Sequence, residues 1–171
     1  MTVVVGISRR NGSPDALRWA VDEARIRGTR VLAVTAWRPP RPPAAPAARP
    51  PGVSPIPAEQ ARSEERQRLV ELMEQQLGGP LEAFGVEYEL RTGAPTAVLL
   101  AAAAEGELLV LDSPRTGDLS AVRKSWIAPS IVLRSQCPVV VMPRMSRPHE
   151  HSVLERLADA AAEAGRPGLK L

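Results

Sequence analysis

Two fully apolar runs of four residues constrain the fold of this chain more than any other feature. They are residues 108–111 and 139–142, and between them lie a polar, basic loop and a helical pattern that runs to Arg134. Short apolar runs connected through a helix are typical of neighbouring parallel strands buried on both faces. Ligands of such sheets bind beyond the carboxyl ends of the strands, so the loop at residues 112–124 is the first candidate for function.

Strand and helix patterns alternate along the rest of the chain. Apolar or alternating runs predict three more strands, at residues 3–7, 30–36 and 86–91. Apolar residues at helical spacing predict helices at residues 14–27, 58–77 and 96–104. This order predicts a Rossmann-like α/β fold, with a five-stranded parallel sheet and helices on both faces. If strand one is central, with strand order 3-2-1-4-5, the switch point lies between strands one and four, where loops 8–12 and 112–124 meet.

Local signals refine these elements. Ser13 is expected to cap the first helix and Gly28 to end it. The charged stretch at residues 59–68 of the second helix is expected to be solvated. Strand 86–91 alternates apolar and charged residues, so we expect one wet face and an edge position in the sheet.

The segment at residues 38–57 interrupts the pattern. Half of the eighteen prolines lie between Trp37 and Pro57, and such a sequence forms neither a helix nor the interior of a sheet. We expect a loop of polyproline II character, and it is either a docking segment for a protein partner or a tolerated insertion. The predicted domain is residues 1–144 with this insert, followed by a polar linker and a short C-terminal helix at 145–171.

Composition excludes several classes of partner. The net charge is only +3, aromatic residues make up 3%, and no basic run exceeds two residues, so no nucleic-acid partner is expected. No apolar stretch approaches eighteen residues, so no membrane partner is expected. Cys137 is the single cysteine and residues 2–7 read as a strand, so we expect a cytoplasmic protein.

Several short motifs occur in a diagnostic order along residues 2–144. They are VVVGI at 3–7, GS at 12–13, ALRWA at 16–20, GAP at 93–95, LLV at 108–110, VLR at 132–134 and CPVVVMP at 137–143. In this order and spacing the chain resembles the universal stress protein (UspA) family. The resemblance implies an adenine nucleotide alpha hydrolase-like fold, a regulatory role in the stress response and a homodimer.

The resemblance fails at the nucleotide motif. ATP-binding members carry an aspartate at the end of strand one and G-x2-G-x9-G-[S/T] after strand four, where glycines let backbone N–H groups approach phosphates. The family's aspartate falls on Ser8, and the motif positions fall on Asp112, Arg115, Ser125 and Trp126. An indole and a carboxylate at these positions disfavour a triphosphate. We therefore expect a divergent member with a degenerate motif, no cofactor and no bound ATP.

Basic residues on the two switch-point loops support an alternative function. These loops carry five basic residues and only two acidic ones, Asp112 and Asp118. The basic residues are Arg9, Arg10, Arg115, Arg123 and Lys124. Such a rim either binds an adenine nucleotide or smaller anion, or is a solvated basic edge. The residues of this vestigial nucleotide site or anion site are Ser8, Arg9, Arg10, Asp112, Arg115, Ser125 and Trp126.

No residue pattern indicates catalysis or a metal. Cys137 has no activating base placed by the sequence, so it is expected to be a packed thiol. His149 and His151 flank Glu150 without further ligands, so no metal site is expected. The chain is therefore expected not to be an enzyme.

The last apolar run suggests an interface. If residues 139–142 form an edge strand, their unpaired backbone groups need a cover, and the same strand of a second copy supplies one symmetrically. The alternative cover is the C-terminal helix. We expect a homodimer, with a dimer edge formed by Val139, Val140, Val141 and Met142.

Overall fold

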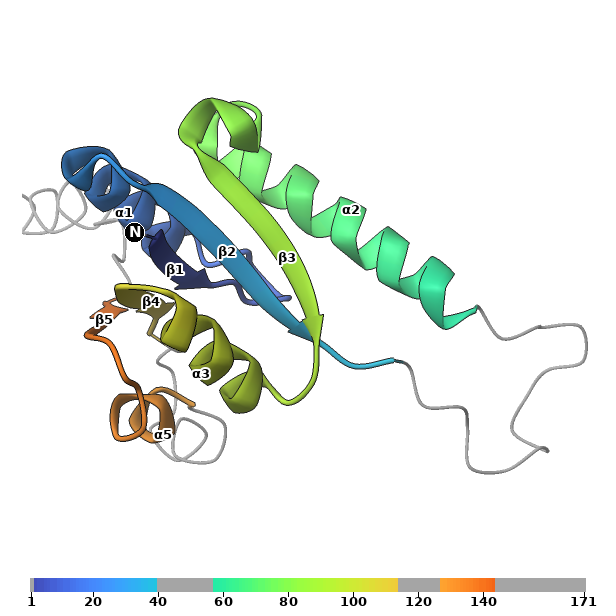
Figure 1. Cartoon of the computed structure of the whole chain (residues 1–171). Coiled ribbons are helices and arrows are strands. Elements are labelled where there is room, and N and C mark those ends of the chain that lie inside the picture. The colour runs from blue at the N-terminus through green and yellow to red at the C-terminus, as the bar shows by residue number, and fades with distance from the viewer. Residues whose placement is uncertain (1, 40–56, 114–126, 144–171) are drawn as a thin grey trace, which may run out of the picture.

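The computed structural model describes residues 2–39, 57–113 and 127–143 (Figure 1). Its elements in chain order are β1 Thr2–Gly6, α1 Pro14–Arg27, β2 Arg30–Trp37, α2 Ala58–Leu77, a short 3-10 helix η2 Leu81–Phe84, β3 Val86–Thr92, α3 Pro95–Glu105, β4 Leu108–Asp112, α5 Ala128–Val132 and β5 Val139–Met142.

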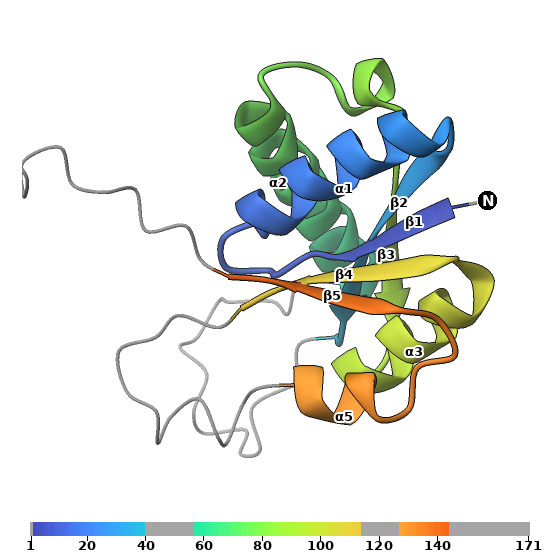
Figure 2. The ribbon, with the colours of Figure 1, turned by 90° about the vertical axis from the view of Figure 1, so that its left-hand side faces the viewer.

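The five strands form one parallel sheet with the order β3-β2-β1-β4-β5. Helices α1 and α2 cover one face, and α3 and α5 cover the other (Figure 2). Central β1 is fully enclosed, since Val3, Val4 and Val5 are all buried. The predicted fold class and strand order are confirmed.

The carboxyl end of β4 extends one residue further than the sequence predicted. Asp112 is the last residue of the strand and pairs with Met142 of β5. The N–H of Ser113 then donates to the Met142 carbonyl at 2.8 Å. Hydrophobicity alone ends the run at Leu111, because it does not detect a polar residue held in a ladder by its backbone. Asp112 therefore belongs to the sheet and not to the loop.

The two ends of α1 differ in how well they were predicted. Gly28 ends the helix in the left-handed conformation, with φ 64°, as expected. Ser13 occupies the N-cap position with φ 51°, but its side chain makes no hydrogen bond to the first turn. Its Oγ instead accepts the N–H of Ser8 at 3.0 Å. The predicted capping role of the Ser13 side chain is wrong, because that oxygen is used to close the preceding loop.

The edge strands show opposite environments. In β3, Val86, Tyr88 and Leu90 are buried while Glu87 and Glu89 are exposed, which confirms the predicted wet face and edge position. All four residues of β5 are half-buried at the other edge. The helix predicted to run through Arg134 is shorter, since α5 ends at Val132.

Several predictions concern residues outside the described ranges. They include most of the proline-rich insert, the loop that carries Arg115, Arg123, Lys124, Ser125 and Trp126, and the tail with His149 and His151. Within the described ranges, no helix combines the length and hydropathy needed to cross a membrane. The same ranges hold no cluster of three or more His, Cys, Asp or Glu side chains able to bind a metal ion.

Candidate functional site at the carboxyl ends of β1 and β4

The side chain of Asp112 crosses the switch point to the start of α1. Its Oδ1 accepts the backbone N–H of Ala16 at 2.8 Å. Ala16 is the third residue of α1, so its N–H is one of the first-turn donors that have no partner within the helix. A carboxylate here also faces the positive end of the helix dipole. Asp112 therefore supplies the capping hydrogen bond that the Ser13 side chain does not make.

Ser8 is used to build the loop between β1 and α1. Its N–H donates to Ser13 Oγ, and its Oγ accepts the N–H of Arg10 at 3.3 Å. Its carbonyl accepts the N–H of Gly12 at 2.9 Å. Each polar group of Ser8 thus takes part in a hydrogen bond within the loop.

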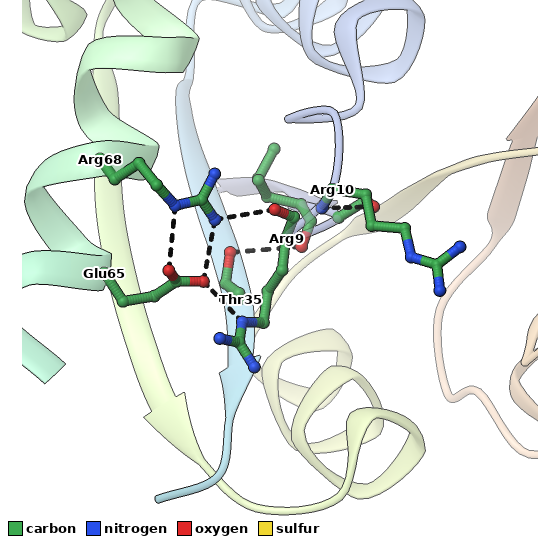
Figure 3. Close-up of polar contacts among 7 residues, drawn as sticks. Arg9, Arg10, Thr35, Glu65 and Arg68 are labelled. Carbon is green, nitrogen blue, oxygen red and sulfur yellow. Dashed lines mark hydrogen bonds and ion pairs between the residues drawn. The ribbon is translucent and has the colours of Figure 1, made fainter. Parts of the chain in front are cut away.

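Helix α2 holds this loop from outside the sheet. Arg9 forms an ion pair with Glu65 of α2, and Arg68 donates to both oxygens of the same carboxylate at 3.0 Å (Figure 3). Arg68 also donates to the Arg9 carbonyl at 2.8 Å. The Arg68 guanidinium, and then Arg9, hold the pKa of Glu65 below its ordinary value, although burial acts in the opposite direction.

Arg9 and Arg10 diverge from each other. In Figure 3 the Arg9 guanidinium lies against Glu65, whereas the Arg10 side chain extends to the opposite side of the loop. The Arg9 guanidinium is therefore held against α2, and because Glu65 also pairs with Arg68, the three groups together carry one net positive charge. Of these two arginines, Arg10 is the one whose guanidinium forms no ion pair with another described residue.

The role of α2 was missed in the sequence. Most of residues 59–68 are exposed, as expected, but the Glu65 side chain is only 12% exposed. Gln76 also contacts the loop, through a hydrogen bond from its Nε2 to the Asn11 carbonyl at 2.6 Å. Residues 65, 68, 72 and 76 share one helical face. This spacing was the available signal, but hydrophobicity does not report a face that is polar and packed.

The end of β1 is tied to β2 beneath this cluster. Thr35 is buried, and its Oγ1 donates to the Ile7 carbonyl at 3.2 Å. The Ile7 N–H donates to the Val34 carbonyl at 2.8 Å. The loop that begins at Ser8 therefore starts from a fixed position.

A comparison with models of protein families shows which family this chain belongs to. A model described as the universal stress protein family matches residues 1–143. The chain belongs to this family. Among curated proteins, none matches it significantly.

Solved structures of other universal stress proteins share the fold. One in complex with cAMP is 19% identical, with a TM-score of 0.57 and coverage of 84% of this chain and 96% of that chain. UspA from Lactobacillus plantarum is 16% identical, with a TM-score of 0.59 and coverage of 83% and 97%. A protein from Archaeoglobus fulgidus in complex with dAMP is 20% identical, with a TM-score of 0.50 and coverage of 82% and 96%.

Two of the residues expected at positions of the family's ATP motif, Ser8 and Asp112, lie within the described residues of this universal stress protein. Both side chains make hydrogen bonds inside the protein, Ser8 to Arg10 and Asp112 to Ala16. The Ser8 and Asp112 side chains therefore both take part in interactions within the fold.

Proposed function

We propose that this universal stress protein is a non-enzymatic, cytoplasmic regulatory domain that acts in the stress response through protein contacts and does not bind ATP. The proposed contact surface is the β5 edge, and the proline-rich segment 38–57 is either a second docking segment or a tolerated insertion. The observation that best supports the absence of ATP binding is the hydrogen bond between Asp112 and Ala16. It leaves a carboxylate at the carboxyl end of β4, where ligands of parallel sheets bind.

The charge balance around Asp112 supports the same proposal. A triphosphate that approaches this edge of the sheet is repelled by the Asp112 carboxylate, and the Ala16 N–H is already bonded. Arg9 is held in an ion pair with Glu65, a carboxylate that also pairs with Arg68, so these three groups together carry one net positive charge. A phosphate that binds the Ala16 N–H must displace the Asp112 carboxylate.

Calorimetric titration of the full chain with ATP tests this proposal. We expect no binding in the micromolar range. A variant that restores the motif, with Asp112→Gly, Arg115→Gly, Ser125→Gly and Trp126→Ser together, is expected to gain affinity, which also shows that the assay detects binding. Micromolar binding of ATP by the wild type that is lost in Arg115→Ala would contradict the proposal.

A second candidate function is a site for an adenine nucleotide with a single phosphate, or for a smaller anion. The structures of universal stress proteins in complex with cAMP and dAMP favour it. Arg10 extends away from Glu65 and can pair with one phosphate, and Arg115, which lies outside the described residues, is the second basic residue that the sequence assigns to this site. Titration with AMP, cAMP and inorganic phosphate separates the two functions: binding that is lost in both Arg10→Ala and Arg115→Ala replaces the first proposal with the second.

The protein contact that the structure supports best is a homodimer through β5. The Leu109 N–H donates to the Pro138 carbonyl, and the Ser113 N–H donates to the Met142 carbonyl. Since alternate residues of a strand face the same neighbour, the N–H and C=O groups of Val139 and Val141 point to the open edge. A second copy of β5 can pair with these groups and form a closed dimer.

Light scattering during size exclusion tests the dimer. We expect the wild-type chain to elute with the mass of two chains. Val141→Pro removes an outward N–H without breaking a bond to β4, so it should give monomers. Val141→Thr keeps that N–H and nearly the same shape, so it serves as the matched control and should remain dimeric. A wild-type monomer at all concentrations would contradict the dimer.

A further inference from the structure

The sheet has two edges, and whether each edge is open to pairing with another strand decides what kind of assembly the chain can form. A strand at an edge carries a row of backbone N–H and C=O groups that can pair with another chain. One open edge closes as a symmetric dimer, whereas two open edges allow chains to add without limit. In this sheet the edges are β3 and β5.

The register of β3 identifies its outward carbonyls. The Val31 N–H donates to the Gly85 carbonyl at 3.0 Å, and the Gly93 N–H donates to the Trp37 carbonyl at 2.9 Å. Odd-numbered residues of this segment therefore bond to β2, because alternate residues of a strand face the same neighbour. The carbonyls of Tyr88 and Leu90 accordingly face the open edge.

Two arginines of α2 bind these outward carbonyls. Arg66 Nη1 donates to the Tyr88 carbonyl at 3.2 Å, and Arg62 Nη2 donates to the Leu90 carbonyl at 3.0 Å. The Arg66 guanidinium also lies over the Tyr88 ring, 5.6 Å from its centroid. These contacts bridge α2 and β3, which run side by side in Figure 1.

Helix and strand spacings match at this contact. Arg62 and Arg66 are separated by about 6 Å along the helix axis. Tyr88 and Leu90 are separated by about 7 Å along the strand. One helical face can therefore bind two successive outward carbonyls in the middle of β3, whose outward-facing residues also include Val86 and Thr92.

The β5 edge has no equivalent cover among the described residues. Within residues 2–39, 57–113 and 127–143, no side chain donates to the outward carbonyl of Val139 or Val141. The two edges of the sheet are therefore unlike: guanidinium groups bind two outward carbonyls of β3, those of Tyr88 and Leu90, and no described side chain binds those of β5.

We propose that Arg62 and Arg66 close the β3 edge against pairing with a second copy of the chain, so that association through β5 stops at a dimer. The step from closed edge to dimer rests on the homodimer proposed above. Each guanidinium takes an acceptor that an incoming strand would need, and its charge repels the same arginines of another copy that approaches edge to edge.

Sedimentation velocity of the full chain tests the proposal over a range of concentrations. The double variant Arg62→Ala, Arg66→Ala is expected to form species of at least about twice the wild-type mass that grow with concentration, since an open β3 edge adds a second pairing surface. The matched control, Arg25→Ala with Arg27→Ala, removes the same charge from exposed positions on α1 and should sediment as the wild type. The pair Arg62→Lys, Arg66→Lys retains donors and should also sediment as the wild type.

The outcomes separate this proposal from the homodimer. If the wild type is monomeric, the proposed homodimer through β5 is wrong. The double alanine variant should then form a dimer and no larger species, because only its β3 edge can pair. A folded double alanine variant with the wild-type mass at every concentration overturns the role of the arginines. If the double variant does not fold, Arg62→Ala alone carries the test, because Arg66 still packs on Tyr88 and only the Leu90 carbonyl is opened.

Discussion

The Asp112 carboxylate accepts a hydrogen bond from the Ala16 N–H at 2.8 Å, although 96 positions separate the two residues. This contact joins the end of β4 to the first turn of α1 across the switch point of the sheet. The cap of α1 is therefore supplied by a residue of β4 and not by the residues that directly precede the helix. It lies in the region where proteins of this architecture bind ligands. The same contact therefore bears on stability and on ligand binding.

Replacement of Asp112 should measure the strength of this cap. We expect Asp112→Ala to lower the free energy of unfolding by about 1 kcal/mol, because the Ala16 N–H loses its acceptor and the helix loses a favourable charge. Asp112→Asn keeps an acceptor oxygen and should lose less. Asp22→Ala, at an α1 position whose side chain is 70% exposed, is the control. Equal urea-denaturation midpoints for Asp112→Ala and Asp22→Ala would show that the cap adds no stability.

The Glu65 carboxylate should make stability depend on pH. Its pKa is lowered in the folded protein by Arg68 and Arg9, from an ordinary value of 4.5. The stabilisation is therefore fully present above the ordinary pKa and is lost as the pH falls through the folded-state pKa. Glu65→Gln should destabilise the protein near neutral pH, by about 1 kcal/mol, and the difference from the wild type should shrink in acid.

Glu71→Gln provides the control for this titration. Glu71 is an exposed residue of the same helix, and its side chain accepts a hydrogen bond from Gln67. Its replacement should change the free energy of unfolding little. A Glu65→Gln variant whose deficit stays constant from neutral to acid pH would show that the charge of Glu65 is not what holds the loop.

Gly12 should be the least replaceable residue of the β1–α1 loop. Its φ is +70°, and a Cβ there would lie 2.8 Å from Gln76 Nε2. Gln76 cannot move freely, because that nitrogen binds the Asn11 carbonyl. Gly28 has a similar φ of +64° but open space around it. Gly28→Ala should cost about 1 kcal/mol from backbone strain alone, and Gly12→Ala about 1 kcal/mol more from the clash.

Thermal and urea unfolding of the two alanine variants measure this difference. Because both positions share the left-handed backbone, the difference isolates the contact between the loop and α2. If Gly12→Ala and Gly28→Ala lower the free energy of unfolding equally, the loop can shift to accommodate the new Cβ. The contact with Gln76 then does not restrict the conformation of the loop.

Hydrophobic periodicity was sufficient for the framework. The runs at 108–111 and 139–142, the alternation in β3 and the Gly28 helix end were all predicted correctly. Each of these signals depends on residues close together in the chain, where burial and turn chemistry act directly. The family motifs lie on this framework, so the family too could be predicted.

The polar residues of the site could not be assigned in the same way. The Ser13 side chain was expected to cap α1, but it bonds to Ser8 and leaves that role to Asp112. Arg9 was expected at an anion site, and the structure shows it paired with Glu65 of α2. A hydroxyl, carboxylate or guanidinium accepts many partners, so its choice depends on which segments the fold brings beside it.

The sequence by itself determined the α/β class, the strand order and the family, because residue type and spacing carry that information. Only the tertiary structure decided that Asp112 belongs to β4 and caps α1. It also decided that α2 clamps the β1–α1 loop and that Arg62 and Arg66 bind the outward carbonyls of β3. The physical reason is that hydrogen bonds and ion pairs act over a few ångströms of space, and chain folding sets which distant residues come within that range.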